Sequence, residues 1–287
     1  MPKTVFKMRH FKHFKRWPRL SDDVSKLDSL VHYIMQHAIE NGNNPRWGLM
    51  ADKFAARAEV DRILGPGHLV PLLGHWDNPE DIDFDTLPKS FILKTNNGCG
   101  TNIFVHDKDK ADRQDIVNKL KKALSFPYPE LTGQLHYSLI PPMVIAERIM
   151  VQDGNHKSLT DYKIHCVNGI PRILYVYTDR DEVNHFNYNI KPYTPHWQLI
   201  PEWKTPDDVA DHPVAPDKPQ WLDEMMEFAR RLSAGEEYVR VDFYHTGGKI
   251  LFGEMTYTPD TAYNNCFIPY QPAMKYLLNK IVEERNS

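Results

Sequence analysis

Two strand-like segments near the C-terminus, residues 238–244 and 249–256, constrain the fold more than any other part of this chain. Both are rich in β-branched and aromatic residues, which favour strands. The residues between them, 245–248, end in two glycines, which is typical of a hairpin turn. We therefore predict two antiparallel strands joined by a short turn, with one face of the hairpin buried in a core.

The other face of this hairpin is expected to gather four polar side chains. Because successive side chains of a strand alternate, Arg240 and Asp242 share one face of the first strand, and Glu254 and Thr256 share one face of the second. Neighbouring carboxylates repel each other unless a cation lies between them. Oxygen ligands of this kind suit Mg²⁺, which often accompanies nucleotide phosphates. An ordinary polar face in contact with solvent is the alternative, and the hairpin alone does not exclude it.

The composition sets the broad class of the protein. With 287 residues the chain can bury a sizeable core, as one large domain or as two closely packed lobes. Its net charge of −3 gives no reason to expect binding to nucleic acid. Cys99, Cys166 and Cys266 are too far apart for a zinc site or a redox motif, which indicates reduced thiols. No apolar run suggests a membrane span or a secretory signal, so we expect a cytoplasmic protein.

The first twenty residues have a different character. They contain seven Lys or Arg and no acidic residue, and aromatic residues are interleaved with the basic ones. This pattern predicts contact with an anionic membrane surface or an anionic polymer, and hence a location that includes the membrane periphery. The alternative is a basic arm that packs on the acidic stretch 202–237 of the same chain. A transit peptide is disfavoured by the low serine content and by the helix expected directly afterwards.

Helices and strands are intermixed along the rest of the chain. Apolar spacing and cap residues predict helices over 21–40, 50–64, 111–124, 221–232 and 272–284. Strands are predicted over 68–73, 90–93, 103–105, 143–146, 161–168 and 172–178, and a loop over 184–219. Because the strands pair mainly through hairpins, the fold class is predicted to be α+β with antiparallel sheets.

A glycine-containing loop follows the predicted strand that ends at Lys94. Gly98 and Gly100 would let backbone N–H groups approach phosphate oxygens, and the lysine would supply a compensating charge. The loop lacks the ending of a Walker motif and the spacing of a dinucleotide fingerprint. A hairpin loop that covers phosphates from above fits better, with an ordinary tight turn as the alternative.

The order of these features resembles the ATP-grasp superfamily over about residues 50–262, and most closely its TupA-like family. Members of that family are presumed amidoligases of bacterial cell-surface polysaccharide synthesis. The matching segments are residues 52–57, 87–100, 161–165, 240–244 and 252–259. The resemblance implies an α+β ATP-grasp fold, in which two lobes with antiparallel sheets enclose ATP. Its implied parts are a shortened N-terminal region (1–50), two lobes (51–146 and 147–270) and a C-terminal helix (271–287).

The resemblance also implies a nucleotide site. Contacts to the ATP phosphates are expected from Lys53, Lys94 and the loop residues Asn97, Gly98, Gly100 and Thr101. The hinge beneath adenine is expected at Glu147, Arg148 and Ile149, mainly through backbone groups. Asp161 matches the acid that binds the ribose hydroxyls.

The implied chemistry lies on the hairpin and on the strand beside it. Asp242 and Glu254 would hold Mg²⁺, with Thr256 as a third ligand where many members carry Asn. Arg240 would steady the transferring phosphoryl group. Lys163 and Arg180 are candidates for the same cleft, although both would also suit exposed strand positions.

These implications predict an ATP- and Mg²⁺-dependent carboxylate–amine ligase that works through an acyl phosphate. Its substrates would be an amine or amino acid and the carboxylate of a uronic acid, in synthesis of a capsule or O-antigen-type polysaccharide. The short basic N-terminal region suggests a large anionic saccharide acceptor. The alternatives are a kinase-like phosphotransferase and a non-catalytic nucleotide-binding accessory of polysaccharide assembly. A glycosyltransferase is disfavoured because its D-x-D signature does not stand on a convincing strand end; residues 81–83 and 83–85 have this spacing but lie in an acidic connection. A zinc hydrolase is disfavoured because its paired histidine motifs are missing.

Overall fold

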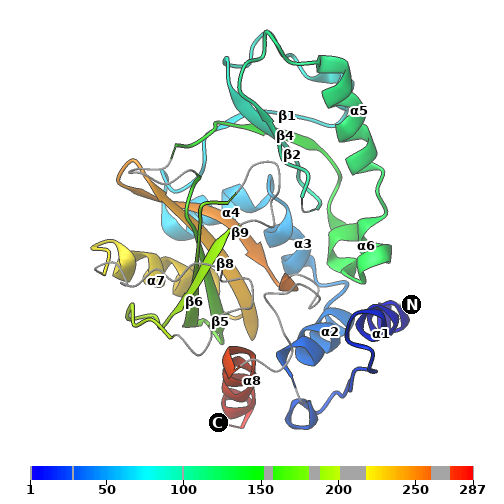
Figure 1. Ribbon diagram of the computed structural model, residues 1–287, viewed down its shortest axis with the longest axis vertical. Coiled ribbons are helices and arrows are strands. Elements are labelled where there is room, and N and C mark those ends of the chain that lie inside the picture. Colours follow the sequence, from blue (N-terminus) through cyan, green and yellow to red (C-terminus); the bar gives the residue numbers. More distant parts are fainter. Residues whose placement is uncertain are drawn as a thin grey trace.

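Two antiparallel sheets organise the molecule. The computed structural model describes residues 2–27, 29–98, 100–151, 158–180, 188–200, 218–259 and 272–286. Figure 1 shows a four-stranded sheet at the top and a five-stranded sheet below it, with helices packed against both. Strands and helices alternate irregularly along the chain, which confirms the predicted α+β class.

The four-stranded sheet carries the glycine loop. It contains β1 (Leu72–Trp76), β2 (Phe91–Thr95), β3 (Ile103–Val105) and β4 (Val144–Glu147), in the order β1-β4-β2-β3. Helix α5 (Arg113–Leu124) covers one face, where Phe91 and Leu93 belong to the same buried cluster as Ile116 and Leu120. Because side chains alternate along β2, Lys94 lies on the opposite face.

The five-stranded sheet contains the hairpin. Its strands are β5 (Asp161–Val167), β6 (Ile170–Thr178), β7 (Asn189–Tyr193), β8 (Tyr238–Thr246) and β9 (Lys249–Thr256), in the order β7-β6-β5-β8-β9. One face packs on the amphipathic helix α7 (Leu222–Leu232), with Ile164 and Val241 in that core. The other face changes character along the strands. The lower part of this face, near α8, is apolar and includes Val167 and Tyr238. Its upper part, toward the four-stranded sheet, is polar.

The remaining helices surround the five-stranded sheet and connect the two sheets. They are α1 (Pro2–Phe14), α2 (Leu30–Glu40), α3 (Pro45–Ala51), α4 (Ala56–Leu64), α6 (Tyr128–Thr132) and α8 (Pro272–Arg285). Short 3-10 turns cover η1 (Val24–Lys26), η2 (Pro79–Asp81) and η3 (Leu135–Leu139). Residues of α2 and α8 share the buried cluster beneath the lower part of the sheet. No helix in the described ranges combines the length and the apolar character needed to cross a bilayer.

Several predicted element bounds are wrong, for local reasons. The helix predicted over 21–40 begins only at Leu30, because the Ser29 side chain accepts the His32 N–H and caps it there. The helix predicted over 50–64 is instead the end of α3 and the whole of α4, separated by residues 52–55. The strand predicted over 68–73 lies at 72–76. Within 184–219, predicted as loop, β7 is a strand, and 184–187 and 201–217 lie outside the described residues.

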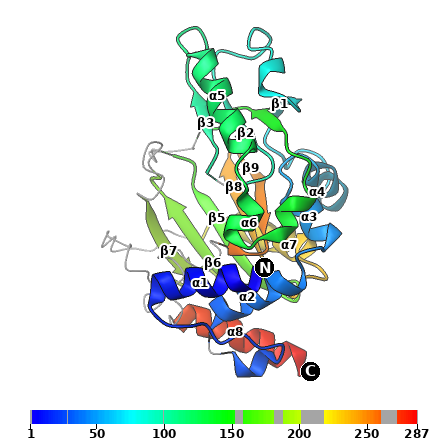
Figure 2. The ribbon, with the colours of Figure 1, turned by 90° about the vertical axis from the view of Figure 1, so that its right-hand side faces the viewer.

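The basic N-terminal segment is helical and packs on the body of the protein. Figure 2 shows α1 lying below α6 and beside α2, and its main contacts are with these two helices. Phe6 and His10 are buried in this contact. The guanidinium of Arg9 donates a hydrogen bond of 2.8 Å to the Leu131 carbonyl of α6. The alternative that the arm packs on the acidic stretch 202–237 is untested for residues 202–217, which lie outside the described residues.

Candidate functional site

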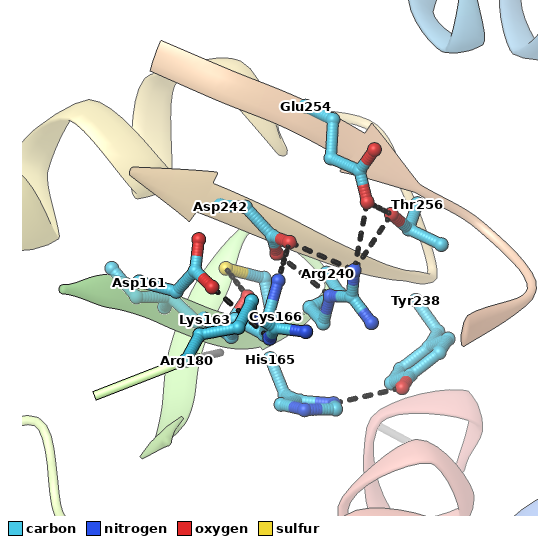
Figure 3. Close-up of polar contacts among 11 residues, drawn as sticks. Asp161, Lys163, His165, Cys166, Arg180, Tyr238, Arg240, Asp242, Glu254 and Thr256 are labelled. Atoms are coloured by element: carbon cyan, nitrogen blue, oxygen red, sulfur yellow. Dashed lines mark hydrogen bonds and ion pairs between the residues drawn. The ribbon is translucent and has the colours of Figure 1, made fainter. Parts of the chain in front are cut away.

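The polar part of the five-stranded sheet brings together side chains from three strands. Asp242 on β8 lies opposite Lys163 on β5 and opposite Glu254 on β9. Arg240 lies opposite Thr256, two register positions further from the turn and on the same face. All five were predicted site residues, and Figure 3 shows them pointing toward one another.

A β-bulge in the hairpin is responsible for this arrangement. The turn is tighter than predicted, because β8 continues to Thr246 and only Gly247 and Gly248 lie between the strands, both with positive φ. Register shifts between the pair Phe243–Phe252 and the pair Asp242–Glu254, so that Gly253 is an extra residue on β9. A Cβ on Gly253 would lie 3.1 Å from the Asp242 carbonyl oxygen, which leaves little space for any other residue.

Arg240 is the centre of the cluster. Its Nε donates to Asp242 Oδ1 at 2.7 Å and its Nη2 to Oδ2 at 2.8 Å, a two-point contact. The same Nη2 donates to Glu254 Oε1 at 2.9 Å and to Thr256 Oγ1 at 3.1 Å. The Lys163 ammonium donates to the second Asp242 oxygen. Two cationic side chains therefore offset the charge of two carboxylates on one face of the sheet.

The charges of this cluster extend to the other sheet. Burial and the charge of Asp242 oppose ionisation of Glu254, but the positive charges of Arg240, Lys53 and Lys163 outweigh them and lower the pKa of Glu254. Lys53 lies between α3 and α4, outside the five-stranded sheet. Its influence on Glu254 means that the predicted phosphate lysine and the predicted metal ligands share one electrostatic environment.

His165 lies next to the cluster but is held neutral. Burial, followed by the charges of Arg240 and Lys163, lowers the pKa of His165 well below its ordinary value. The ring Nδ1 shares a hydrogen bond of 2.9 Å with the Tyr238 hydroxyl (Figure 3). A neutral imidazole adds no further positive charge, so we assign His165 to support of the sheet.

A second ionic cluster lies on the four-stranded sheet, on the face opposite α5. The Glu147 carboxylate accepts from Lys94 Nζ at 2.8 Å and from Arg57 Nη1 at 3.1 Å. Arg57 also donates to the Val70 carbonyl at 2.7 Å, which ties α4 to the chain just before β1. The carboxylate of Glu147 therefore positions Lys94, a side-chain role in addition to the backbone role predicted for the hinge.

Tyr244 is influenced by the carboxylates of both clusters. Burial, followed by the negative charges of Asp161, Glu254, Asp242 and Glu147, raises the pKa of Tyr244 well above its ordinary value. Three of these acids are on the five-stranded sheet and Glu147 is on the other. The polar faces of the two sheets therefore face a common region.

A buried asparagine holds Lys53 against the glycine loop. Asn96 donates to Asp52 Oδ1 at 3.0 Å and accepts the Met143 N–H at 2.8 Å. Asp52 in turn accepts the Phe54 N–H at 2.8 Å, which fixes the turn between α3 and α4. The adjacent Lys53 donates from its ammonium to the Gly98 carbonyl. This network brings the two predicted phosphate-binding segments together.

The glycine loop itself is closed by a hydroxyl pair. The hydroxyls of Thr95 and Thr101 are 2.9 Å apart, and Gly100 has a φ of 72°. Asn97, Gly98 and Thr101 line a cavity of about 300 Å³, with Lys119, Lys122 and Phe126 from α5 and the residues after it. Lys94 does not line this cavity. Cys99 lies outside the described residues.

The predicted hinge and ribose residues lie at the ends of β4 and β5. The Arg148 N–H donates to the Pro71 carbonyl at 3.0 Å, and Ile149 follows outside any helix or strand. Asp161 pairs with Arg180 Nη2 at 3.1 Å. The Arg180 guanidinium lies over the Tyr188 ring, with Cζ 4.8 Å from the ring centroid. This cation–π contact helps to hold Arg180 beside Asp161.

Comparison with protein families shows which family this chain belongs to. Residues 32–271 match the TupA-like ATP-grasp family. The chain belongs to this family. The match confirms the predicted family and the ATP-grasp fold, and it includes every predicted site residue. No curated protein is similar enough in sequence to count as a relative.

Several solved ATP-grasp structures are similar to this chain. The D-alanine–D-alanine ligase from Bacillus anthracis complexed with ATP is 15% identical, with a TM-score of 0.46 over 82% of this chain and 65% of that one. D-cycloserine synthetase DcsG is 12% identical, with a TM-score of 0.47 over 84% and 71%. The ATP-grasp ligase PsnB with a precursor variant, Mg and ADP is 12% identical, with a TM-score of 0.42 over 88% and 66%. This chain thus spans less than two thirds of the D-alanine–D-alanine ligase.

The oxygen donors of the hairpin fit the Mg²⁺ that ATP-grasp proteins would require. Asp242 and Glu254 supply two carboxylates at one register position, and the Thr256 hydroxyl lies 2.9 Å from Glu254 Oε1. No group of three or more His, Cys, Asp or Glu side chains suited to a metal occurs in the described ranges. Two carboxylates are sufficient for Mg²⁺, because it completes its shell with water and phosphate oxygens.

Sequence reasoning gave no role to three residues that the structure brings to the candidate site. Tyr244 has the same parity on β8 as Arg240 and Asp242, so strand alternation was sufficient to find it. Arg57 stood in a matching segment, but its partner Glu147 is ninety residues away. Asn96 precedes the predicted loop residues, and nothing in the sequence distinguishes it from Asn97.

Proposed function

We propose that this chain is an ATP-dependent carboxylate–amine ligase that forms an amide through an acyl phosphate. The observation that carries the proposal is the pair Asp242 and Glu254, which lie opposite each other with Arg240 bound to both. Membership of the TupA-like ATP-grasp family supports the same chemistry. A face of this kind suits a negatively charged group in transfer, because cationic donors and metal-binding oxygens lie side by side.

The nucleotide would lie between the polar faces of the two sheets. Lys53 and Lys94 would bind the phosphates, together with loop residues Asn97, Gly98, Gly100 and Thr101. The chain at Glu147, Arg148 and Ile149 would pass beneath the base, and Asp161 would accept hydrogen bonds from the ribose. The Lys94–Glu147 pair supports this placement, since a lysine fixed by a buried acid loses less freedom on binding phosphate.

The chemical steps follow from these positions. Asp242, Glu254 and Thr256 would hold Mg²⁺, which would neutralise charge on the phosphates when bound. A substrate carboxylate oxygen attacks the γ-phosphorus, the bond to the β–γ bridging oxygen breaks, and ADP leaves. The amine nitrogen then attacks the acyl carbon, phosphate leaves with the bonding electron pair, and the nitrogen loses a proton. Arg240 would stabilise the transferred group in the first step and the oxyanion in the second, and Lys163 would hold Asp242 in place.

We further propose a uronic acid as the carboxylate and an amine or amino acid as its partner, in synthesis of a surface polysaccharide. The family match supports the pathway, and the cationic face supports an anionic saccharide. Arg180 is proposed to contact a substrate carboxylate, because its guanidinium is held at the edge of the same face.

The test is release of ADP with a panel of amino acids and uronic acids. Wild type should release ADP only when both a carboxylate and an amine are present, and the product should contain a new amide detectable by mass. Asp242→Asn should lower kcat by about a hundredfold or more, because one metal ligand and the Arg240 contact lose their charge. Asp223→Asn on α7, an exposed acid paired with Lys218, is the matched control and should not change the rate.

Each contrary result points to a definite alternative. ADP release that needs only one substrate and yields a phosphorylated product would identify a kinase-like phosphotransferase. ATP binding without turnover would identify a nucleotide-binding accessory. An Asp242→Asn variant as active as wild type would refute the site assignment.

A further inference from the structure

Helix α1 has two apolar faces, although only one of them packs on the protein. Phe6 and His10 point inward and are buried. Met8 and Phe11 lie one turn apart on the outer side, with exposed fractions of 62% and 41%. Trp17, just after the helix, is 60% exposed and stacks on Phe11 with ring centroids 4.6 Å apart. A helix that only covered a core would present polar side chains on its outer face.

Positive charge borders this outer apolar ridge. Lys7 precedes Phe11 by one turn, and Lys12 follows Met8 by one turn. Lys15, directly after the helix, is also exposed. The first twenty residues contain no acidic side chain, whereas the whole chain has a net charge of −3. Positive charge is therefore concentrated in this segment, whereas the rest of the chain carries a net negative charge.

The outer face is carried by a firmly held element. The Phe6 ring packs directly on Gly133, where an added Cβ would lie 2.8 Å from the ring. Arg9 is bound to the Leu131 carbonyl, which fixes the rotation of the helix about its axis. The outer apolar ridge is therefore exposed while α1 stays packed on α6, and no conformational change of the helix is needed to expose it.

We propose that the outer face of α1, formed by Met8, Phe11, Lys12, Lys15 and Trp17, docks on an anionic lipid surface. Aromatic and aliphatic side chains would enter the interface between headgroups and acyl chains, and the lysines would pair with anionic headgroups. A saccharide polymer is the weaker fit. It offers no hydrocarbon to cover Met8, and the stacking of Phe11 on Trp17 already uses one face of each ring.

The test is sedimentation of the full chain with lipid vesicles. Binding is expected to vesicles that contain about one-third phosphatidylglycerol and not to pure phosphatidylcholine, and to weaken as salt is raised. Phe11→Ser with Trp17→Ser should weaken binding by about tenfold or more, because two interfacial anchors are lost. Lys12→Ala and Lys15→Ala should each weaken it by about fivefold. Thermal unfolding should show that all variants remain folded.

A matched control lies at the end of α5. Phe126, which is 50% exposed, and the exposed Lys122 offer the same residue types outside α1. The control Phe126→Ser with Lys122→Ala should leave vesicle binding unchanged. Brominated lipids should quench tryptophan fluorescence in wild type and not in Trp17→Phe.

The proposal is overturned if anionic vesicles bind no better than neutral ones, or if the control variant loses as much binding as the α1 variants. It is also overturned if soluble polygalacturonate binds the α1 face while anionic vesicles do not, which would assign the face to an anionic polymer. None of these outcomes depends on ligase activity. The vesicle experiment therefore tests the docking surface even if the proposed ligase function is wrong.

Discussion

The contact between Phe6 and Gly133 gives a quantitative test of how α1 is held. Gly133 ends α6 with a φ of 79° and a ψ of 5°, in the left-handed region that glycine tolerates best. It is buried beneath the Phe6 ring, and a Cβ built there would lie 2.8 Å from Cζ. Gly133→Ala therefore adds a backbone cost and a steric cost at once.

The two costs can be separated with a second glycine. Gly235 has a φ of 81° and no heavy atom within 4 Å of an added Cβ. Gly235→Ala should therefore lower the free energy of unfolding only by the backbone cost, about 1–2 kcal/mol. Gly133→Ala should lower the free energy of unfolding by the same backbone cost and by a further ~1–3 kcal/mol, because the new methyl group overpacks against Phe6. Urea denaturation at one protein concentration measures both.

A third variant makes the reasoning refutable. In a Phe6→Leu background the ring is gone, so Gly133→Ala should cost about as much as Gly235→Ala, and the coupling between positions 6 and 133 should exceed about 1 kcal/mol. Equal destabilisation by the two single glycine variants, or no coupling to Phe6, would show that α1 does not pack on α6 as described.

Three further predictions concern the core and the site. Burial lowers the pKa of His37 to about 4 and of His136 to about 3, so the unfolded chain takes up protons that the folded chain does not. Stability should therefore fall below about pH 6.5, by about 2 kcal/mol per histidine between about pH 7 and pH 5 in urea denaturation, and His136→Gln should reduce that slope. Asn96→Ala should cost about 2–3 kcal/mol, measured in the same way, because the Met143 N–H loses its acceptor and the buried Asp52 carboxylate loses one of its donors. Arg240→Gln should tighten Mn²⁺ binding without nucleotide by about tenfold in electron paramagnetic resonance titration, because the guanidinium no longer competes for the carboxylates, while kcat falls.

The sequence was sufficient for features set by local periodicity. Alternation along β5 and β8 correctly separated the apolar faces from Asp161, Lys163, Arg240 and Asp242. Asn168 and Gly169, which turn β5 into β6, both have positive φ, and their residue types favour such a turn. Helix starts were less accurate, because caps such as Ser29 are decided by one hydrogen bond.

Features that depend on distant partners were out of reach. Glu147 was found by its place in the order of motifs, but its partners Lys94 and Arg57 come from two other segments. The same holds for β7, whose strand character comes from pairing with β6. Its sequence, with Pro192 and little alternation, does not favour a strand by itself.

The bulge at Gly253 shows why strand parity alone does not determine this site. With Gly247 and Gly248 in the turn, an uninterrupted ladder would place Asp242 opposite Gly253 and would send Glu254 to the opposite face. The extra residue restores Glu254 to the face of Asp242, and Thr256 follows two positions later. The crowding around Gly253 explains the residue type at that position. A glycine that carries no chemistry therefore decides which oxygens can act together, and the metal-binding character of the hairpin depends on it as much as on the acids.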